Sequence, residues 1–120
     1  MIWTDSEIED LYRRYHYNQS VLMLLEPSIT SQLRMDKASG GTEYSKMELM
    51  AIRRAQANID IKIVEACLRF MNQDEREYIN LRYNEDLDVK IVSGCMRCSV
   101  EKVYYLKRRV IKKTRKLLTL

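Results

Sequence analysis

Helix breakers are scarce in this chain, which has three glycines and a single proline among 120 residues. Such a composition argues against a β-sandwich or a disordered chain. Charged residues make up 32% of the sequence and alternate with Leu, Ile and Met, which suits helices with one buried and one solvated face. The chain is therefore predicted to be an all-α protein, and its length favours one domain.

The first predicted helix begins at Thr4 and runs to about Glu26. Glu7 stands three residues after Thr4, which is the spacing of a capping box, and Pro27 is expected to end the helix. Apolar residues recur at steps of three and four between these ends, which is typical of an amphipathic helix. The apolar positions are Ile8, Leu11, Tyr12, Tyr15, Val21, Leu22 and Leu25.

A connector over 27–44 and a second long helix are predicted next. The connector is rich in Ser, Thr and Gly and is expected to be a loop. Its Gly40 and Gly41 have no preceding strand and no following Gly-Lys-Ser/Thr, so a flexible loop is favoured over a phosphate-binding loop. The second helix is expected from Ser45 to about Met71. Its predicted apolar face consists of Met47, Met50, Ala51, Ala55, Ile59, Ile63, Ala66, Cys67 and Phe70.

A helix over 45–71 would be about 40 Å long, which is long for a chain of this size and calls for a partner helix. The first helix can supply that partner as an antiparallel hairpin. A second subunit can supply it in a homodimer, and the sequence leaves both alternatives open. Residues 1–71 are therefore predicted to form a helical hairpin unit with a flexible connector.

Residues 72–120 are predicted to form a unit of three shorter helices, of which the last two make a helix-turn-helix. Asn72 is a good N-cap with Glu75 at the capping-box position, and Ser99 is expected to cap the last helix. Gly94 is expected where close packing between two helices favours a missing side chain. The first helix should end near residue 83, and the second should cover 87–96.

Basic residues are concentrated at the C-terminal end of the chain. Residues 97–120 hold nine basic residues and one acid, for a charge of about +8, while the remaining residues hold 12 basic and 16 acidic side chains. Lysine and arginine near a helix C-terminus also suit the helix dipole, but nine in 24 residues exceed what that effect requires. This separation of charge indicates a polyanionic partner, and nucleic acid is the usual one.

The last predicted helix divides into an apolar stripe and a basic surface. The stripe consists of Val103, Leu106, Val110, Thr114 and Leu117. In a helix-turn-helix the N-terminal turns of the second helix enter the major groove of double-stranded DNA. The residues predicted to lie nearest the bases are Glu101, Lys102, Tyr105, Arg108 and Arg109. The residues predicted to contact phosphates are Arg97, Ser99, Lys112 and Lys113.

The C-terminal stretch resembles region 4 of bacterial primary-type sigma factors, the helix-turn-helix that reads promoter DNA. The matching residues are the ER-x-x-I-x-LRY opening at 75–83, the acid-leucine turn at Asp86 and Leu87, the capping Ser99, Val103, and the KRR run at 107–109. The sequence departs from the usual sigma pattern at Gly94, Cys95 and Cys98.

A wider resemblance, to phage late transcriptional activators of the RinA and ArpU type, covers most of the chain. It includes the tyrosine-bearing first helix, the Gly-Gly connector, the Ser-Lys-x-Glu start at Ser45, and the pair Arg53 and Arg54. Ordinary sigma factors lack this N-terminal part. The resemblance implies a sequence-specific regulator that activates late packaging or structural genes of a phage or mobile element and contacts RNA polymerase.

Two other functions remain compatible with the sequence. One is a protein-interaction module whose long helix docks RNA polymerase or another partner, with incidental affinity for DNA. The other is a small terminase-like DNA-packaging protein, which would form a ring of many subunits. Sequence-specific binding and the size of the assembly distinguish these alternatives from a transcription regulator.

Catalytic and metal chemistry find little support in the sequence. Cys95 and Cys98 have C-x-x-C spacing, but a zinc site would need two more ligands. The only other Cys or His residues in the sequence are Cys67 and the distant His16. Packing cysteines are favoured over a redox switch. We find no nucleophile–base pair, so we expect no enzymatic activity, metal or cofactor.

The sequence also predicts where the chain resides. The longest apolar run, 21–25, is far shorter than the roughly 20 residues of a membrane span. The N-terminus is acidic and shows no secretory apolar region, and three cysteines argue against a secreted disulfide framework. We expect a cytoplasmic protein of a bacterial host cell, with no membrane partner.

Overall fold

The computed structural model describes the backbone of residues 3–36 and 41–119, and the side chains of 3–23 and 45–119. Every regular element within these ranges is helical, so the predicted all-α class is confirmed. The helices are α1 (Asp5–Asp36), α2 (Gly41–Leu68), α3 (Gln73–Ile79), the π-helical segment η1 (Asn80–Asn84), α4 (Val89–Met96) and α5 (Val100–Leu118).

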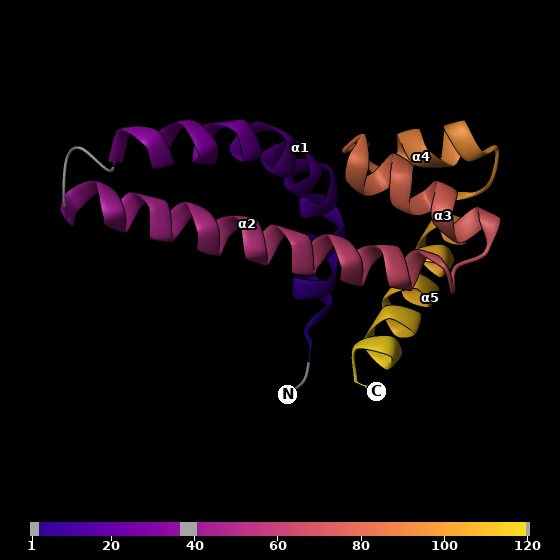
Figure 1. Cartoon of the computed structure of the whole chain (residues 1–120). Helices are drawn as coiled ribbons and strands as arrows, with labels where there is room; N and C mark the ends of the chain where they lie inside the picture. Colours follow the sequence, from indigo (N-terminus) through magenta and orange to yellow (C-terminus); the bar gives the residue numbers. More distant parts are fainter. Residues whose placement is uncertain (1–2, 37–40, 120) are drawn as a thin grey trace.

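The molecule is elongated, with principal extents of 60 × 31 × 21 Å. Helices α1 and α2 run side by side in opposite directions, and α3, α4 and α5 gather at the C-terminal end of α2 (Figure 1). Helix α1 curves from its start beside α5 until it follows α2 (Figure 1). The Ser20 hydroxyl donates to the His16 carbonyl at 3.2 Å, and such bonds to the preceding turn commonly bend helices. Among the described residues, no helix is long and apolar enough to cross a membrane.

The predicted start of the first helix is confirmed, but its predicted end is wrong. The Thr4 hydroxyl accepts from the Glu7 N–H, and the Glu7 carboxylate accepts from the Thr4 N–H, both at 3.2 Å. The backbone remains helical through Pro27 and as far as Asp36. A proline removes one intrahelical hydrogen bond, and packing of α1 along α2 overrides this local preference.

The predicted connector over 27–44 is therefore wrong for most of its length. Residues 27–36 belong to α1, and α2 begins at Gly41 rather than at Ser45. Residues 37–40, which include Gly40, lie outside the described part of the chain. Helix α2 ends at Leu68, three residues before the predicted Met71, and a tight turn follows it.

The buried face of α2 is not the predicted one. The face that packs inward consists of Ala57, Asp60, Val64 and Cys67, and Met71 in the turn after the helix is also buried. Of the predicted apolar positions only Cys67 is buried, whereas Ile59 and Phe70 are 52% and 64% exposed. The helix carries apolar side chains on two adjacent faces, and periodicity alone does not tell which face meets α1.

One hydrophobic cluster joins the N-terminal and C-terminal parts of the chain. Ile8, Leu11 and Tyr12 of α1 pack in the same core as residues of α3, α4 and α5. The Tyr12 and Thr114 hydroxyls share a 2.5 Å hydrogen bond, and the Tyr12 ring stacks on Tyr83 with centroids 5.9 Å apart. The predicted units 1–71 and 72–120 thus share one core, which fixes α5 against the start of α1.

Candidate nucleic-acid interface

Helix α3 begins with the capping box that its sequence predicts. The Asn72 side chain accepts from the Glu75 N–H at 2.9 Å, and the Glu75 carboxylate accepts from the Asn72 N–H at 2.8 Å. Tyr78 and Ile79 of α3 and Tyr83 of η1 are buried in the core. Its last turn is π-helical rather than α-helical, which turns the chain toward α4.

The connection between α4 and α5 is a tight turn. Asp88 caps α4 by accepting from the Ile91 N–H at 2.9 Å, so this helix begins two residues later than predicted. Arg97 ends the helix in the left-handed region, with φ 54° and ψ 47°. Ser99 caps α5 as predicted, since its hydroxyl accepts from the Lys102 N–H at 3.1 Å.

Gly94 does not lie at a close helix contact, so that expectation is wrong. A side chain at this position would meet nothing within 4 Å. Gly94 contributes to the turn through its backbone, since its carbonyl oxygen accepts a hydrogen bond from the Arg97 N–H at 3.3 Å. The main residue that α4 contributes to the core is Val92, which is fully buried.

The apolar stripe of α5 packs inward as predicted. Val103, Val110 and Thr114 are fully buried, and Leu106 is 2% exposed. Ile111, which the sequence analysis did not assign to the stripe, is also buried. The basic residues of α5 are consequently distributed over three other surfaces, which differ in what they contact. We call these the α3 flank, the α1 flank and the crest.

The α3 flank of α5 consists of Lys102, Arg109 and Lys113. Lys113 Nζ lies 2.6 Å and Arg109 Nε 3.2 Å from the two oxygens of Glu75, whose side chain is fully buried. Burial raises the pKa of the Glu75 carboxyl, but the hydrogen bonds from Lys113, from the capping backbone and from Arg109 outweigh burial. The pKa of Glu75 is therefore below its ordinary value, and the carboxylate is charged at neutral pH.

The α1 flank of α5 consists of Lys107 and Arg115. Lys107 Nζ lies 3.7 Å from a Glu9 carboxylate oxygen. Arg115 pairs with the Asp5 carboxylate and donates from Nε to the Trp3 carbonyl at 3.0 Å. These contacts hold the start of α1 against α5, and no feature of the sequence pattern pointed to them.

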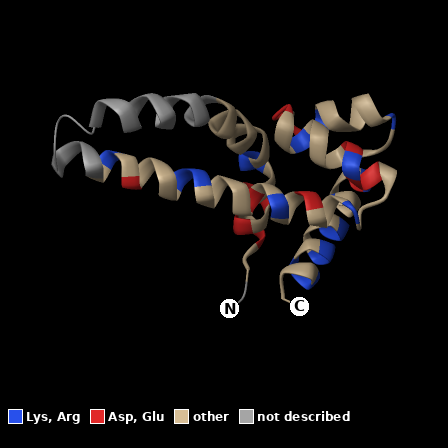
Figure 2. Cartoon of the chain, in the orientation of Figure 1, with Lys and Arg blue, Asp and Glu red and all other residues tan. Residues whose placement is uncertain are grey.

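The crest of α5 lies between these flanks and consists of Glu101, Tyr105, Arg108, Lys112 and Lys116. All five residues are exposed, Tyr105 by 47%. Arg108, Lys112 and Lys116 have no ion-pair partner in the part of the chain that the structure describes. Lysine and arginine line α5 in Figure 2, and the crest is the part of that basic surface left for an external anion.

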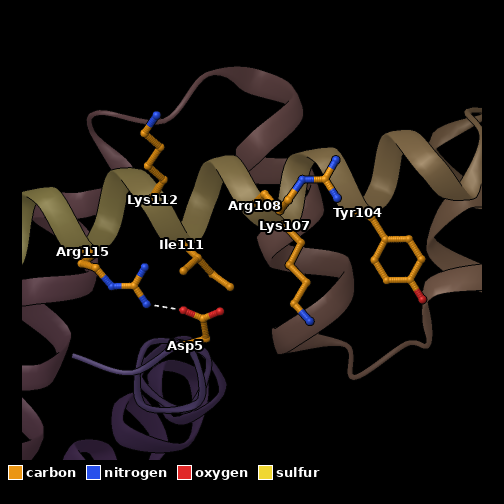
Figure 3. A pocket seen from close by; sticks show the side chains of 7 residues that line it. All are labelled: Asp5, Tyr104, Lys107, Arg108, Ile111, Lys112 and Arg115. Atoms are coloured by element: carbon orange, nitrogen blue, oxygen red, sulfur yellow. Dashed lines mark hydrogen bonds and ion pairs between the residues drawn. The ribbon is translucent and has the colours of Figure 1, made fainter. Parts of the chain in front are cut away.

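A hollow of about 360 Å³ lies beside the crest (Figure 3). Four basic side chains surround it, and Asp5 forms its floor on the side of α1. Its lining residues are Asp5, Tyr104, Lys107, Arg108, Ile111, Lys112 and Arg115. Of the four basic side chains, Arg108 and Lys112 belong to the crest, whereas Lys107 and Arg115 belong to the α1 flank.

The predicted site residues therefore separate into distinct environments. Glu101, Tyr105, Arg108 and Lys112 lie together on the crest. Arg97 and Ser99 lie at the exposed turn before α5, with the Ser99 hydroxyl engaged in capping. The predicted contacts turned toward α3 are Lys102, Arg109 and Lys113, and Arg109 also donates to the Tyr105 hydroxyl at 3.3 Å.

The cysteines lie apart from this interface or at its edge. Cys67 is buried, Cys95 is exposed and Cys98 is partly buried, and all three are free. Burial raises the pKa of the Cys67 thiol, although a hydrogen bond with Tyr12 opposes the shift. Within the described ranges, no group of three or more His, Cys, Asp or Glu side chains is arranged to hold a metal ion.

Comparisons with protein families, with characterised proteins and with solved structures found no match to this chain.

Proposed function

We propose that this chain is a sequence-specific regulator of transcription that binds double-stranded DNA. Helices α4 and α5 act as its helix-turn-helix, and the crest of α5 is the recognition surface. The observation that supports this proposal most strongly is that the basic residues of α5 differ in whether they form ion pairs within the chain. Cations of both flanks pair with acids of α1 and α3, whereas the cations of the crest are exposed and unpaired in the described part of the chain.

We assign exposed residues of the crest and of the turn before it to contacts with bases or with phosphates. Arg108 and Glu101 suit bases, because arginine pairs bidentately with guanine and glutamate accepts from the cytosine amino group. Lys112 and Arg97 suit phosphates, which position the helix without specifying sequence. Arg109 keeps its partner Glu75 and orients the Tyr105 ring, over which its guanidinium lies 5.7 Å from the centroid.

The biological role follows from the resemblance of 75–118 to sigma region 4 and of the whole chain to late phage activators. In this role the protein binds upstream of late packaging or structural genes and contacts RNA polymerase. The exposed turn around Arg97 and the α5 crest are compatible with DNA docking, since both lie on the solvent side of the C-terminal helices.

The test is selection of duplexes from a randomised pool, followed by binding measurements on the enriched sequence and on random DNA. We expect an enriched motif that binds about a thousandfold tighter than random duplex at physiological salt. Arg108→Ala should remove most of this preference. Lys46→Ala, which removes an exposed charge near the start of α2, is the control and should bind normally.

The second candidate is a protein-interaction module with incidental DNA affinity. It is favoured by apolar side chains on the outer face of α2, where Leu49 and Ile52 are more than 60% exposed. If the pool yields no motif and Arg108→Ala binds all duplexes as well as the parent does, the DNA-reading proposal is wrong and this module takes its place. A small terminase-like ring would instead show as an assembly of many subunits.

A further inference from the structure

Helix α2 carries an exposed apolar stripe in strict heptad spacing. The residues of this stripe, which we call the α2 seam, follow one another at steps of three and four from residue 49 to residue 70. Six of the seven positions are apolar, and the polar one, Gln56, donates to the Asp60 carboxylate at 3.1 Å. The residues are Leu49, Ile52, Gln56, Ile59, Ile63, Ala66 and Phe70. Alternating steps of three and four over three heptads are the signature of a helix that packs along another helix. Phe70 lies in the turn that follows the helix.

Most of the α2 seam is not covered within the chain, although Ile63 is partly buried against the core. Leu49, Ile52 and Phe70 are 66%, 64% and 64% exposed, and Ile59 is 52% exposed. Helix α1 meets the adjacent face of α2, whose residues Ala57 and Val64 are buried. Four of the ten exposed large apolar side chains found among the described residues thus stand in one row, whereas isolated apolar residues on a surface would be scattered.

We propose that the α2 seam binds the α2 seam of a second copy of this chain in an antiparallel, two-fold symmetric dimer. A seam of this spacing needs a partner helix with the same spacing, and an identical chain supplies it. The two-fold axis passes near Ile59, so the two Ile59 side chains meet at the centre. Leu49 of each copy then lies near Phe70 of the other.

Charge favours the antiparallel arrangement over the parallel one. Glu48 and Arg69 flank opposite ends of the seam on the same side, so each Glu48 comes near the partner's Arg69. A parallel arrangement would leave Glu48 and the partner's Arg69 at opposite ends of the dimer, about 30 Å apart along the helix, where they cannot pair. It would also place both basic C-terminal ends, each with about +8 charge in 97–120, at one end of the dimer.

The far end of the seam has a place for the partner's side chain. An apolar hollow of about 300 Å³ lies where α2 approaches the end of α5. Its lining residues are Ile63, Ala66, Cys67, Phe70, Leu117 and Leu118. In the antiparallel dimer the partner's Leu49 lies at this hollow, so the seam continues onto α5 and the contact buries apolar surface at both of its ends.

The first test is the mass of the full chain in solution by light scattering or sedimentation. We expect twice the 14.4 kDa of one chain, and Ile59→Glu should reduce the mass to that of a monomer. Asn58→Glu adds the same charge on the exposed side away from the seam and should leave the dimer intact. Circular dichroism should show equal helix content in all three proteins.

Orientation is tested by disulfide formation between copies in which Cys67, a free thiol that lines the hollow, is replaced by alanine and Cys95 and Cys98 are replaced by serine. A mixture of Leu49→Cys and Phe70→Cys chains should give the mixed disulfide, and Leu49→Cys alone should give none. Self-linked Leu49→Cys chains would overturn the antiparallel arrangement. A monomeric parent, a larger ring, or a dimer that survives Ile59→Glu would overturn the α2 seam as the contact.

The dimer does not depend on the proposed function, and the two fail in different experiments. A monomeric parent that still selects a DNA motif refutes the seam and leaves DNA reading in place. A dimer that separates with Ile59→Glu but selects no motif refutes DNA reading and leaves the seam in place.

Discussion

Glu75 joins the start of α3 to the middle of α5 although its side chain is fully buried. The sequence predicted one of its tasks, the capping box with Asn72. Its second task, as the shared anion for Arg109 and Lys113, depends on how α3 crosses α5 and has no local signal. A buried carboxylate is tolerable here because each oxygen accepts a charged donor.

Glu75→Gln should lower the free energy of unfolding by about 1–3 kcal/mol, because a neutral amide replaces the acceptor of two charged donors. Chemical denaturation at neutral pH measures this loss. The capping of α3 can persist through the amide oxygen, so helix content should change little. An unchanged free energy of unfolding would show that the buried ion pairs do not support the fold.

The same residue predicts a pH dependence of stability. The folded pKa of Glu75 lies below its ordinary value, so its stabilisation is complete above the unfolded carboxyl pKa of about 4.3. It is lost as pH falls through the lower folded pKa. The stability difference between the parent and Glu75→Gln should therefore shrink as the solution is acidified below that range. A difference that stays constant under acid would contradict the assigned charge state.

Replacement of Arg97 by glycine is predicted to stabilise the fold and to weaken DNA binding. The left-handed backbone of Arg97, φ 54°, suits glycine better than arginine. Arg97→Gly should raise the free energy of unfolding by up to about 1 kcal/mol, since a side chain there is strained. The same change should weaken DNA binding through the loss of a phosphate contact. Thermal denaturation and duplex binding of one variant test both effects.

At the scale of elements, the short C-terminal helices were easier to predict from sequence than the long ones. The caps at Asn72 and Ser99 and the stripe of α5 carry strong local signals, and all three predictions are confirmed. The end predicted at Pro27 is wrong because packing along α2 outweighs one lost hydrogen bond. The inward face of α2 was mispredicted because the helix has two apolar faces.

For the candidate site too, the sequence pattern predicted local features but not tertiary contacts. Sequence predicted the basic helix and four of the five residues of the crest, all but Lys116, because a helical repeat places side chains on faces. It did not distinguish a cation of the crest from one that anchors α5. Lys112 and Lys113 are neighbours of the same type, yet Lys113 lies 2.6 Å from Glu75 and Lys112 is exposed without an ion-pair partner in the described chain. Only tertiary packing separates them.

This pair of lysines gives the prediction for α5. Lys112→Ala should reduce the salt slope of DNA binding by about 1 and leave stability unchanged, as expected for a lost phosphate contact. Lys113→Ala should lower the free energy of unfolding by about 1 kcal/mol through the loss of its charged hydrogen bond. Its salt slope should stay close to that of the parent. Binding at several salt concentrations and denaturation of both variants provide the comparison, and reversed effects would contradict the division into crest and flank.

At the scale of the whole molecule, one core ties α5 to the start of α1 through Tyr12, Thr114 and the Arg115 contacts. The basic crest therefore has a fixed orientation relative to the hairpin of α1 and α2. In a dimer built on the α2 seam, the way the two α2 helices pack would therefore fix the positions of the two crests relative to each other. The spacing of the crests then becomes a property of α2 rather than of a linker.

The separation of the two α2 ends, beside which the C-terminal helices gather (Figure 1), can be estimated and compared with the spacing of half-sites on DNA. Phe70 lies eleven residues from Ile59, or about 16 Å along a helix, so the two C-terminal ends stand about 33 Å apart along α2. Half-sites one turn apart on DNA are about 34 Å from centre to centre. The selected motif should therefore contain two inverted half-sites at this spacing. Insertion of half a turn between them turns the second half-site to the opposite face of the duplex, so affinity should fall to that of a single half-site. Ile59→Glu, a monomer, should bind both duplexes equally, and a parent indifferent to the insertion would mean that each crest reads DNA alone.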